Sequence, residues 1–303
     1  MLTGKWLVIY NPDAGKGKGQ KIAQTLSRFM RAKGAQDIIL FEAVTPQYVK
    51  DYVKEVASLQ EPFSCLVIGG DGTLGTVVDA VASAHASCAI AVYPAGTAND
   101  FATSCKVPKR KRAFVRFLES TTPQSTDIMC VNGTYMIHAL GVGNFTNGAV
   151  VYSQHLKKWL GKLGYYAKCL KDASTMKSAY VSVHIDDKIY SGNYFFFYIV
   201  NAPVAGGFRK FAPEAQANDG YFDFIGFKAC KFTEFTEIFL KLLSGKHIQH
   251  KKVVYVKGKV FDISTQTKNP RFQVSDIDGN VGASLPLHAE VVHKPLKIYR
   301  NIN

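Results

Sequence analysis

Residues 65–82 read CLVIGGDGTLGTVVDAVA: four apolar residues, three glycines around one aspartate, and then a segment with helical spacing. The segment 65–68 is short and wholly apolar, as in a strand that is buried on both faces. Gly69 and Gly70 end this strand, and residues 74–82 predict a helix. A buried strand followed at once by a helix is the repeating unit of a parallel α/β sheet, so this stretch decides the fold class.

The same alternation extends over the first third of the chain. Further strand-like segments lie at 6–10, 38–41 and 88–93, and helix-like segments lie at 20–33 and 47–59. The pattern predicts a three-layer αβα domain, in which helices cover both faces of a parallel sheet. Ligands on such sheets bind at the carboxyl ends of the strands.

After about Asp127 the pattern changes, and strands joined by turn residues predominate. Two helices are expected here, at 152–176 and 232–243. The whole half predicts an antiparallel sheet or a β-sandwich. We therefore expect a nucleotide-binding domain over 1–127, a β-sandwich domain over 128–286, and a segment 287–303 that could pack back on the first domain. The strand-like segments are 128–137, 179–185, 188–198, 221–227, 253–263 and 271–274, with the strongest turn signals at 186–187, 218–220 and 278–280.

Composition limits the protein classes that fit. No apolar segment approaches the ~18 residues of a membrane-spanning helix, and the first residues lack the pattern of a signal peptide. The six cysteines are scattered without a paired motif, which predicts neither a disulfide framework nor a zinc site. We therefore expect a cytoplasmic protein.

The net charge is +14, with basic clusters at 106–112 (KVPKRKR) and 246–252 (KHIQHKK). Such a surface attracts anionic membranes, phosphorylated ligands or nucleic acid, although any single cluster is more often only a solvated surface. No aromatic-interleaved RNA motif or basic recognition helix is present, so we expect no nucleic-acid partner. Peripheral association with an anionic membrane is the favoured interpretation.

Three glycine-rich loops follow predicted strands. Residues 11–19 (NPDAGKGKG) combine glycines, which turn backbone N–H groups toward an anion, with lysines, although the Walker A spacing is absent. Residues 69–73 (GGDGT) place one carboxylate at a strand tip, where it could orient Mg²⁺ or accept a proton. Residues 94–102 (PAGTANDFA) offer a hydroxyl, an amide and a carboxylate, although Asn99 or Asp100 could simply cap the next helix. Each loop alone could be an ordinary turn between a strand and a helix. Ordinary turns do not explain why all three are expected at the same edge of one sheet.

In order and spacing, NPDAGKGK, GGDGT and PAGTANDFA resemble the catalytic domain of diacylglycerol kinases, most closely the soluble bacterial lipid kinases of the YegS and DgkB type. The resemblance continues through residues 162–166, 218–221 and 278–286. It implies an N-terminal nucleotide domain, a C-terminal β-sandwich domain and an active site between them.

The resemblance also assigns roles to single residues. Asp127 and Lys168 match positions that reach into the cleft, and Asp71 is central to the binding of ATP and Mg²⁺. Asp219, with the carbonyls of Gln216 and Tyr221, resembles a structural magnesium site, for which a plain Asn-Asp-Gly hairpin turn is the alternative. The remaining residues implied to contact the nucleotide or complete its site are Asn11, Lys16, Thr45, Gly69, Gly70, Gly72, Thr73, Thr97, Asn99 and Asp100.

Two positions depart from the family pattern. The family reads Asp-Gly-Glu near its end, with the Glu as the proposed proton acceptor, whereas this chain has Asp278-Gly279-Asn280. An amide cannot accept that proton at neutral pH. Gly75 and Thr76 stand where the family has Asn-Glu. Either Asp71, Asp276 or Asp278 replaces the base, or much of the rate is lost.

Three functions follow as hypotheses. The favoured one is an ATP- and Mg²⁺-dependent kinase that phosphorylates diacylglycerol or a related neutral lipid. This kinase would act at a membrane surface, and a homodimer is a possible form of it. The second is a catalytically impaired, kinase-like regulator that binds nucleotide or lipid. The third, least favoured, is a cofactor kinase similar to NAD kinase, which shares the GGDGT loop.

Overall fold

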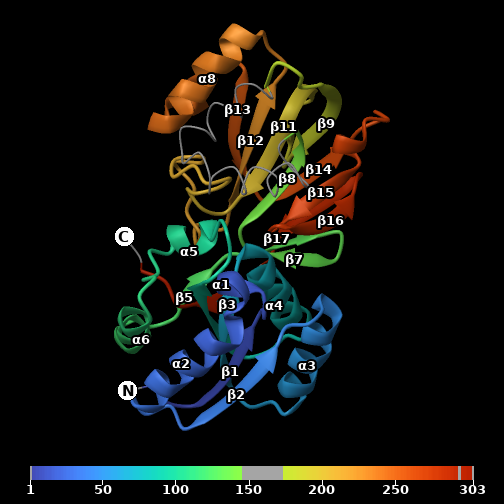
Figure 1. Ribbon diagram of the computed structural model, residues 1–303. Coiled ribbons are helices and arrows are strands. Elements are labelled where there is room, and N and C mark those ends of the chain that lie inside the picture. Colours follow the sequence, from blue (N-terminus) through green and yellow to red (C-terminus); the bar gives the residue numbers. More distant parts are fainter. Residues whose placement is uncertain (1, 145–172, 293–294, 302–303) are drawn as a thin grey trace. The chain divides into compact units, whose positions relative to one another are not determined.

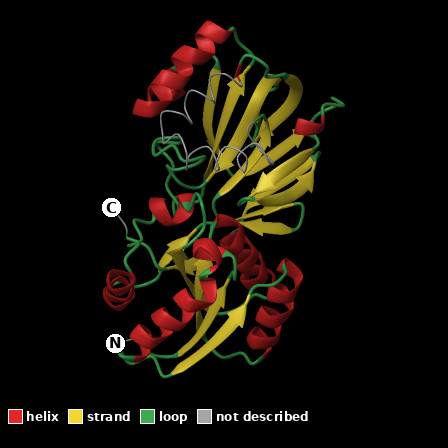
Figure 2. Cartoon of the chain, in the orientation of Figure 1, coloured by secondary structure: helices red, strands yellow, loops and turns green. Residues whose placement is uncertain are grey.

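The computed structural model describes residues 2–144, 173–292 and 295–301 (Figures 1 and 2). The chain forms two compact units. Unit 1 comprises Met1–Ile128, Tyr135–Ile137 and His293–Asn303, and unit 2 comprises Met129–Thr134 and His138–Val292. Each unit has its own sheet and its own core.

Unit 1 contains a six-stranded sheet in the order β2-β1-β3-β4-β18-β5. The first four strands in the chain are parallel, and β18 lies parallel to β4 and antiparallel to β5. The predicted parallel α/β fold is therefore confirmed. The strands are β1 (Lys5–Tyr10), β2 (Asp37–Glu42), β3 (Phe63–Gly69), β4 (Cys88–Pro94), β5 (Gln124–Thr126) and β18 (Leu296–Ile298).

Helices cover both faces of this sheet: α2 (Gly19–Arg31) and α6 (Lys111–Ser120) lie on one face, and α3 (Pro46–Ser58) and α4 (Asp71–Ser83) on the other (Figure 1). Helix α2 buries Ala23, Leu26 and Met30, which share one face at helical spacing. Central strands and α4 are apolar on nearly all sides because they are enclosed between layers. This layering leaves the strand ends as the place for chemistry.

Unit 1 differs from the sequence prediction mainly at the strand ends. Helix α4 begins at Asp71 rather than at residue 74: Gly69 ends β3, Gly70 is the N-cap residue, and Asp71, Gly72 and Thr73 form the first helical turn. The short helix α1 (Ala14–Gly17) and the longer α6 were not predicted, whereas α5 (Asp100–Ser104) begins where Asn99 or Asp100 was expected to cap a helix. Helix α1 spans too few residues to show an apolar period, and basic residues mask the start of α6.

Unit 2 is built from antiparallel strands, as predicted. The main sheet runs β16-β15-β8-β11-β9-β14-β17-β6, with β10 paired to β9, and β12 and β13 continuing from β11; β7 (Thr134–Met136) follows β6 in the chain. The strands are β6 (Met129–Val131), β8 (Ala139–Gly143), β9 (Ala179–Ile185), β10 (Lys188–Ile189), β11 (Gly192–Val200), β12 (Phe222–Lys228), β13 (Val253–Gly258), β14 (Val260–Ser264), β15 (Val274–Ile277), β16 (Asn280–Ser284) and β17 (Leu287–Val291).

One core of unit 2 lies between α8 (Phe232–Ser244) and the sheet. Phe196 and Phe227 stack with centroids 4.4 Å apart, and Ile238 and Phe239 of α8 belong to the same buried cluster. Aromatic pairs of this kind contribute beyond their buried area. Within the described residues no helix is both long and apolar enough to cross a bilayer.

Several predicted elements of unit 2 divide in the structure. The expected strand 128–137 is interrupted at Asn132 and Gly133, which both have positive φ, as a two-residue hairpin turn requires. Residues 253–263 form two strands, and 270–272 form a 3₁₀ turn before β15. The predicted helix 152–176 lies almost wholly outside the described residues.

His247 gives unit 2 a pH-dependent stability. Its ring is buried, its Nε2 lies 2.9 Å from the carbonyl oxygen of Phe211, and it stacks on Phe227. Burial lowers the pKa of His247 from 6.5 to about 4. Between those values the unfolded chain binds more protons, so stability is full above pH 6.5 and falls as the pH drops toward 4.

We expect the free energy of unfolding to fall by up to about 3 kcal/mol over this range because of His247. Denaturant unfolding of the full chain at pH 7 and pH 4.5 measures it. His247→Gln should flatten the dependence, whereas the same substitution at His184, an exposed residue of β9, is the control. Equal dependence in wild type and His247→Gln would contradict the assignment.

Candidate functional site

The three glycine-rich loops meet at the carboxyl ends of β1, β3 and β4, which are neighbours in the sheet of unit 1. The backbone joins them directly. Gly15 N–H donates to the Ala95 carbonyl at 2.8 Å, which links the first loop to the third. Ala95 and Gly96 N–H groups donate to the Gly69 carbonyl at 2.9 and 3.0 Å, which links the third loop to the second. The three loops therefore form one junction.

Glycine is required where the second and third loops cross. A Cβ on Gly96 would overlap the backbone of Gly70, and a Cβ on Gly69 would lie 2.5 Å from Thr73 Oγ1. Real side chains do not tolerate such distances. Gly96 thus allows two backbones to approach closely, and Gly69 leaves space for the Thr73 side chain.

Asp71 connects the same two loops through its side chain. Its Oδ2 accepts a hydrogen bond from Asp100 N and its Oδ1 from Phe101 N, both at 3.1 Å. These are the first N–H groups of α5, so a carboxylate from another loop caps this short helix. Charge-assisted bonds of this type are stronger than neutral ones, and they fix the position of the third loop.

Asn99 does not cap α5 with its side chain, although it stands at the N-cap position with φ 55°. Its Oδ1 accepts from Gly96 N at 2.8 Å and its Nδ2 donates to the Gly96 carbonyl at 2.7 Å. Asn99 therefore holds the third loop in its turn. The neighbouring Asp100 side chain is buried, and Thr97 at the tip of the loop is exposed.

In the first loop, Asn11 and Lys16 have different surroundings. Asn11 Oδ1 accepts from Asp13 N at 2.8 Å, and Asn11 N–H donates to the Ile68 carbonyl at 3.0 Å. Lys16 is exposed and has φ 64°, in the left-handed region. Asn11 thus ties the loop to β3, while the Lys16 ammonium is open to solvent.

The remaining predicted nucleotide contacts lie at helix starts. Gly72 and Thr73 form the first turn of α4, whose positive dipole end faces the loop junction. Thr45 caps α3, since its Oγ1 accepts from Tyr48 N at 3.2 Å. Asp127 is buried at the end of unit 1, and Lys168 lies outside the described residues.

Asp278 and Gly279 form the two-residue turn between β15 and β16, with φ 51° and 83°. Asp278 is buried, and its Oδ1 accepts from the N–H groups of His138 and Ala139 at 2.9 Å each. This carboxylate positions the start of β8. Asp276 Oδ1 accepts from Gly279 N at 2.9 Å, while Asn280 is exposed at the start of β16. Asn280 follows this turn as the first residue of β16.

Asp219 lies at the end of the long loop between β11 and β12, and not in a tight turn that joins two paired strands directly. Its Oδ1 accepts from Tyr221 N at 3.1 Å, and its Oδ2 lies 2.5 Å from the Lys257 ammonium. Gln216 in the same loop is exposed. Lysine already supplies a positive charge here, so a divalent cation at Asp219 would have to share the carboxylate with it. Among the described residues no group of three or more His, Cys, Asp and Glu side chains could hold a metal ion.

Sequence reasoning missed Asp79, which is almost fully buried in α4. Its Oδ2 lies 2.5 Å from the Lys50 ammonium, and its Oδ1 accepts from Tyr135 N at 2.9 Å. A single aspartate inside the apolar stretch VVDAVA was the available signal. Thr76, where the family has an acidic residue, instead donates its hydroxyl to the Gly72 carbonyl at 3.0 Å within α4.

Comparison with known proteins agrees with this arrangement. Residues 5–131 match the family model of the diacylglycerol kinase catalytic domain, and residues 140–300 match the YegS C-terminal NAD kinase beta sandwich-like domain. A diacylglycerol kinase of Bacillus subtilis is 29% identical over 98% of this chain and 94% of its own, and one of Staphylococcus carnosus is 28% identical over 96% and 94%. A solved diacylglycerol kinase structure from Bacillus anthracis has the same fold, with a TM-score of 0.79 at 22% identity over 98% of this chain and 97% of its own.

The fold, the loop junction and these relatives define a two-domain kinase. More particularly, the chain belongs to the diacylglycerol kinase family, with the YegS-type C-terminal domain.

The glycine crossing leads to a test of the site. We expect Gly96→Ala to destabilise unit 1 by about 1–3 kcal/mol, because the new Cβ overlaps the backbone of Gly70. The displaced third loop should weaken ATP binding at least about 10-fold, as measured by titration calorimetry. Gly192→Ala is the matched control, since the nearest atom to its Cβ lies 3.8 Å away. Unchanged ATP affinity in Gly96→Ala would show that the junction does not hold the nucleotide.

Proposed function

We propose that the protein transfers the γ-phosphoryl group of ATP to the hydroxyl of diacylglycerol or a related neutral lipid, with Mg²⁺. The observation that carries this proposal is the backbone junction of the three loops, closed by the Asp71 carboxylate. Phosphoryl transfer depends mostly on positioning and on neutralising charge, and loops held together by backbone hydrogen bonds would supply positioning.

The nucleotide phosphates would lie over the start of α4, where the helix dipole and its first N–H groups favour an anion. Gly70 and Gly96 let the second and third loops pack against each other beside the start of α4, because a side chain on Gly96 would overlap the backbone of Gly70. The exposed Lys16 would reach phosphate oxygens from the first loop, and Thr97 and Asn11 would complete the contacts. Thr45 would contact the nucleotide from the start of α3.

Magnesium is compatible with the donors that are present. Mg²⁺ is usually held by one or two carboxylates together with substrate phosphates, rather than by a cage of protein ligands. Asp71 lies at the junction and would be that carboxylate; its oxygens already accept N–H bonds, which fixes their direction. When bound, the ion would neutralise phosphate charge. A second ion at Gln216, Asp219 and Tyr221 stays a prediction, because Lys257 already pairs with Asp219.

A lipid substrate requires contact with a membrane surface, and the net charge of +14 supports attraction to anionic bilayers. We propose peripheral association, from the cytoplasm, on this ground. Formation of a homodimer stays a prediction, because neither the charge nor the fold tests it.

One observation favours a second candidate, a kinase-like regulator with impaired turnover. Asn280 follows the Asp278-Gly279 turn where relatives of this type are expected to carry a glutamate base. Loss of general-base assistance typically costs about 10²- to 10⁴-fold in rate, whereas nucleotide binding is unaffected. A cofactor kinase is less favoured, since the N-terminal half matches the diacylglycerol kinase model.

The function is tested by incubating the full chain with labelled ATP, Mg²⁺ and a panel of diacylglycerol, monoacylglycerol, sphingoid base and NAD. We expect label on diacylglycerol. Asp71→Asn should lower the rate about 100-fold or more, because one of the two accepting oxygens becomes an NH2 group, which cannot accept an N–H bond, and the negative charge is lost.

Asp51→Asn is the control, since Asp51 is exposed on α3 and bonded only locally, to Gln47. Circular dichroism checks that both variants fold. ATP binding without transfer to any lipid would contradict the lipid kinase proposal. Transfer to NAD alone would show that the substrate is NAD and not a lipid.

The base is tested by Asn280→Glu, which restores a carboxylate after the turn. We expect turnover to rise about 10- to 100-fold. We also expect the rate to fall at low pH, where the new carboxylate becomes protonated and can no longer accept a proton. Val281→Glu is the matched control, because it places the same charge on the most exposed neighbouring position of the hairpin. Equal turnover in wild type and Asn280→Glu would show that another group accepts the proton.

A further inference from the structure

Two exposed side chains with apolar surface lie where β2 leads into α3 in unit 1. Val44 is 65% exposed and Tyr48 is 52% exposed. They stand on either side of Thr45, the N-cap residue of α3, in one segment of five residues. Single exposed apolar residues are ordinary on a protein surface, but a patch beside a ligand site is a reason to look for a ligand that it contacts.

The patch lies at the same edge of the sheet as the loop junction. Strand β2 is the neighbour of β1, and the order β2-β1-β3 puts it two strands from β3, which is roughly 10 Å. Ala43 N–H donates to the carbonyl of Tyr10 at 2.8 Å, and Tyr10 directly precedes the first loop. The patch therefore continues the junction on its β2 side, whereas the third loop and α5 follow β4 on the other side.

The ring of Tyr48 is held in place by packing. Phe41, which is buried in β2, stacks on Tyr48 with ring centroids 4.8 Å apart. Phe41 also stacks on Tyr52, one turn further along α3, with centroids 4.1 Å apart. Half of the Tyr48 side chain nevertheless stays open to solvent. A flat ligand that stacks on a ring already fixed in this way costs the protein little conformational freedom.

Thr45 places a hydroxyl beside this ring. Its Oγ1 accepts a hydrogen bond from Tyr48 N at 3.2 Å, which fixes the direction of the side chain. A hydroxyl that accepts such a bond still has its own hydrogen to donate. A donor next to an aromatic ring suits a nucleoside, because its base is flat and its ribose and base carry acceptors.

We propose that the base of the nucleotide stacks on Tyr48, with Val44 against the edge of the base and the Thr45 hydroxyl donating to a ribose or base acceptor. The nucleoside would then extend along the sheet edge from the start of α4, past β1, to β2. A purine suits this surface better than a pyrimidine, since its larger ring gives more area for stacking. The inference rests on the proposed function, because it locates the other end of the same ATP molecule.

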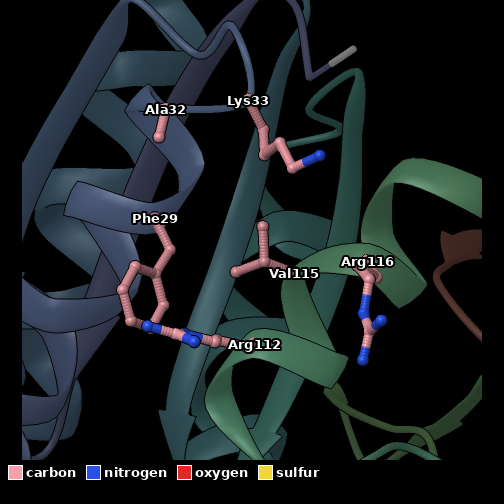
Figure 3. Close-up of a pocket in the computed structure, with 6 residues that line it drawn as sticks. All are labelled: Phe29, Ala32, Lys33, Arg112, Val115 and Arg116. Atoms are coloured by element: carbon pink, nitrogen blue, oxygen red, sulfur yellow. The ribbon is translucent and has the colours of Figure 1, made fainter.

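The groove between α2 and α6 is not a competing site for this base. Figure 3 shows Phe29 on the α2 side of that groove and Val115 on α6. Leu2 N–H donates to the Lys33 carbonyl at 2.9 Å, so the groove lies by the amino end of β1, a strand of six residues and thus roughly 20 Å long. A nucleotide with its phosphates at the carboxyl ends of the strands does not reach it. The groove is lined by Phe29, Ala32, Lys33, Arg112, Val115 and Arg116.

The experiment is titration calorimetry of the full chain, in Mg²⁺, with ATP, UTP and inorganic tripolyphosphate. Tripolyphosphate has the phosphates but no base, so it reports on the loop junction alone. We expect Tyr48→Ala to lower the affinity for ATP about 10-fold or more, because a base that stacks on an aromatic side chain loses this contact. The loss should be smaller for UTP, and the affinity for tripolyphosphate should change less than about twofold.

Three further variants separate stacking from a general effect on the fold. Tyr48→Phe keeps the ring and should restore most of the ATP affinity that Tyr48→Ala loses. Tyr180→Ala is the matched control, since Tyr180 of β9 in unit 2 is 61% exposed and far from these loops in the chain. Tyr48→Trp gives a direct signal, because its added fluorescence should be quenched by ATP and not by tripolyphosphate. Circular dichroism checks that each variant folds.

The outcomes distinguish this inference from the proposed function. Equal ATP affinity in wild type and Tyr48→Ala, or an equal loss for ATP and tripolyphosphate, would overturn base stacking while phosphate binding at the junction stands. A higher KM for diacylglycerol in Tyr48→Ala, with nucleotide affinities unchanged, would show that the patch contacts lipid instead. A wild-type chain that binds neither ATP nor tripolyphosphate would overturn both.

Discussion

The structure of unit 1 depends on a close backbone crossing between the turn after β3 and the turn after β4. The Gly69 carbonyl accepts two N–H groups from the third loop, and Gly70 and Gly96 approach so closely that neither position can hold a Cβ without displacement. Because the strands are parallel and adjacent, their ends must share one edge of the sheet. The crossing joins the loops at this shared edge through backbone hydrogen bonds.

Asp71 has a structural task in this junction, and the proposed function gives it a second one. Its carboxylate caps α5 and thereby fixes the third loop. In the proposed function the same negative charge would hold the metal ion that accompanies the phosphates. The two tasks would be difficult to separate by substitution, because both depend on the same carboxylate oxygens.

The two departures from the family pattern fall in different units, Thr76 on α4 of unit 1 and Asn280 at the start of β16 of unit 2. The loop junction lies wholly in unit 1, whereas Asn280 and the Asp219–Lys257 pair lie in unit 2. If the proposed function holds, a chain that keeps the loop junction but has Thr76 and Asn280 at positions that are acidic in the family pattern is expected to bind nucleotide more securely than it turns substrate over.

The sequence by itself determined the alternation of strands and helices, the change to antiparallel structure after Asp127, and the loops that meet at the sheet edge. Apolar periodicity and glycine clusters are local properties, so they can be read along the chain. Only the tertiary structure decided that Asp71 caps α5, that Lys257 pairs with Asp219 and that Asp79 is buried against Lys50. These contacts join residues about 30 or more positions apart, and no local pattern records which distant partner a side chain meets, because packing of whole layers brings the two together.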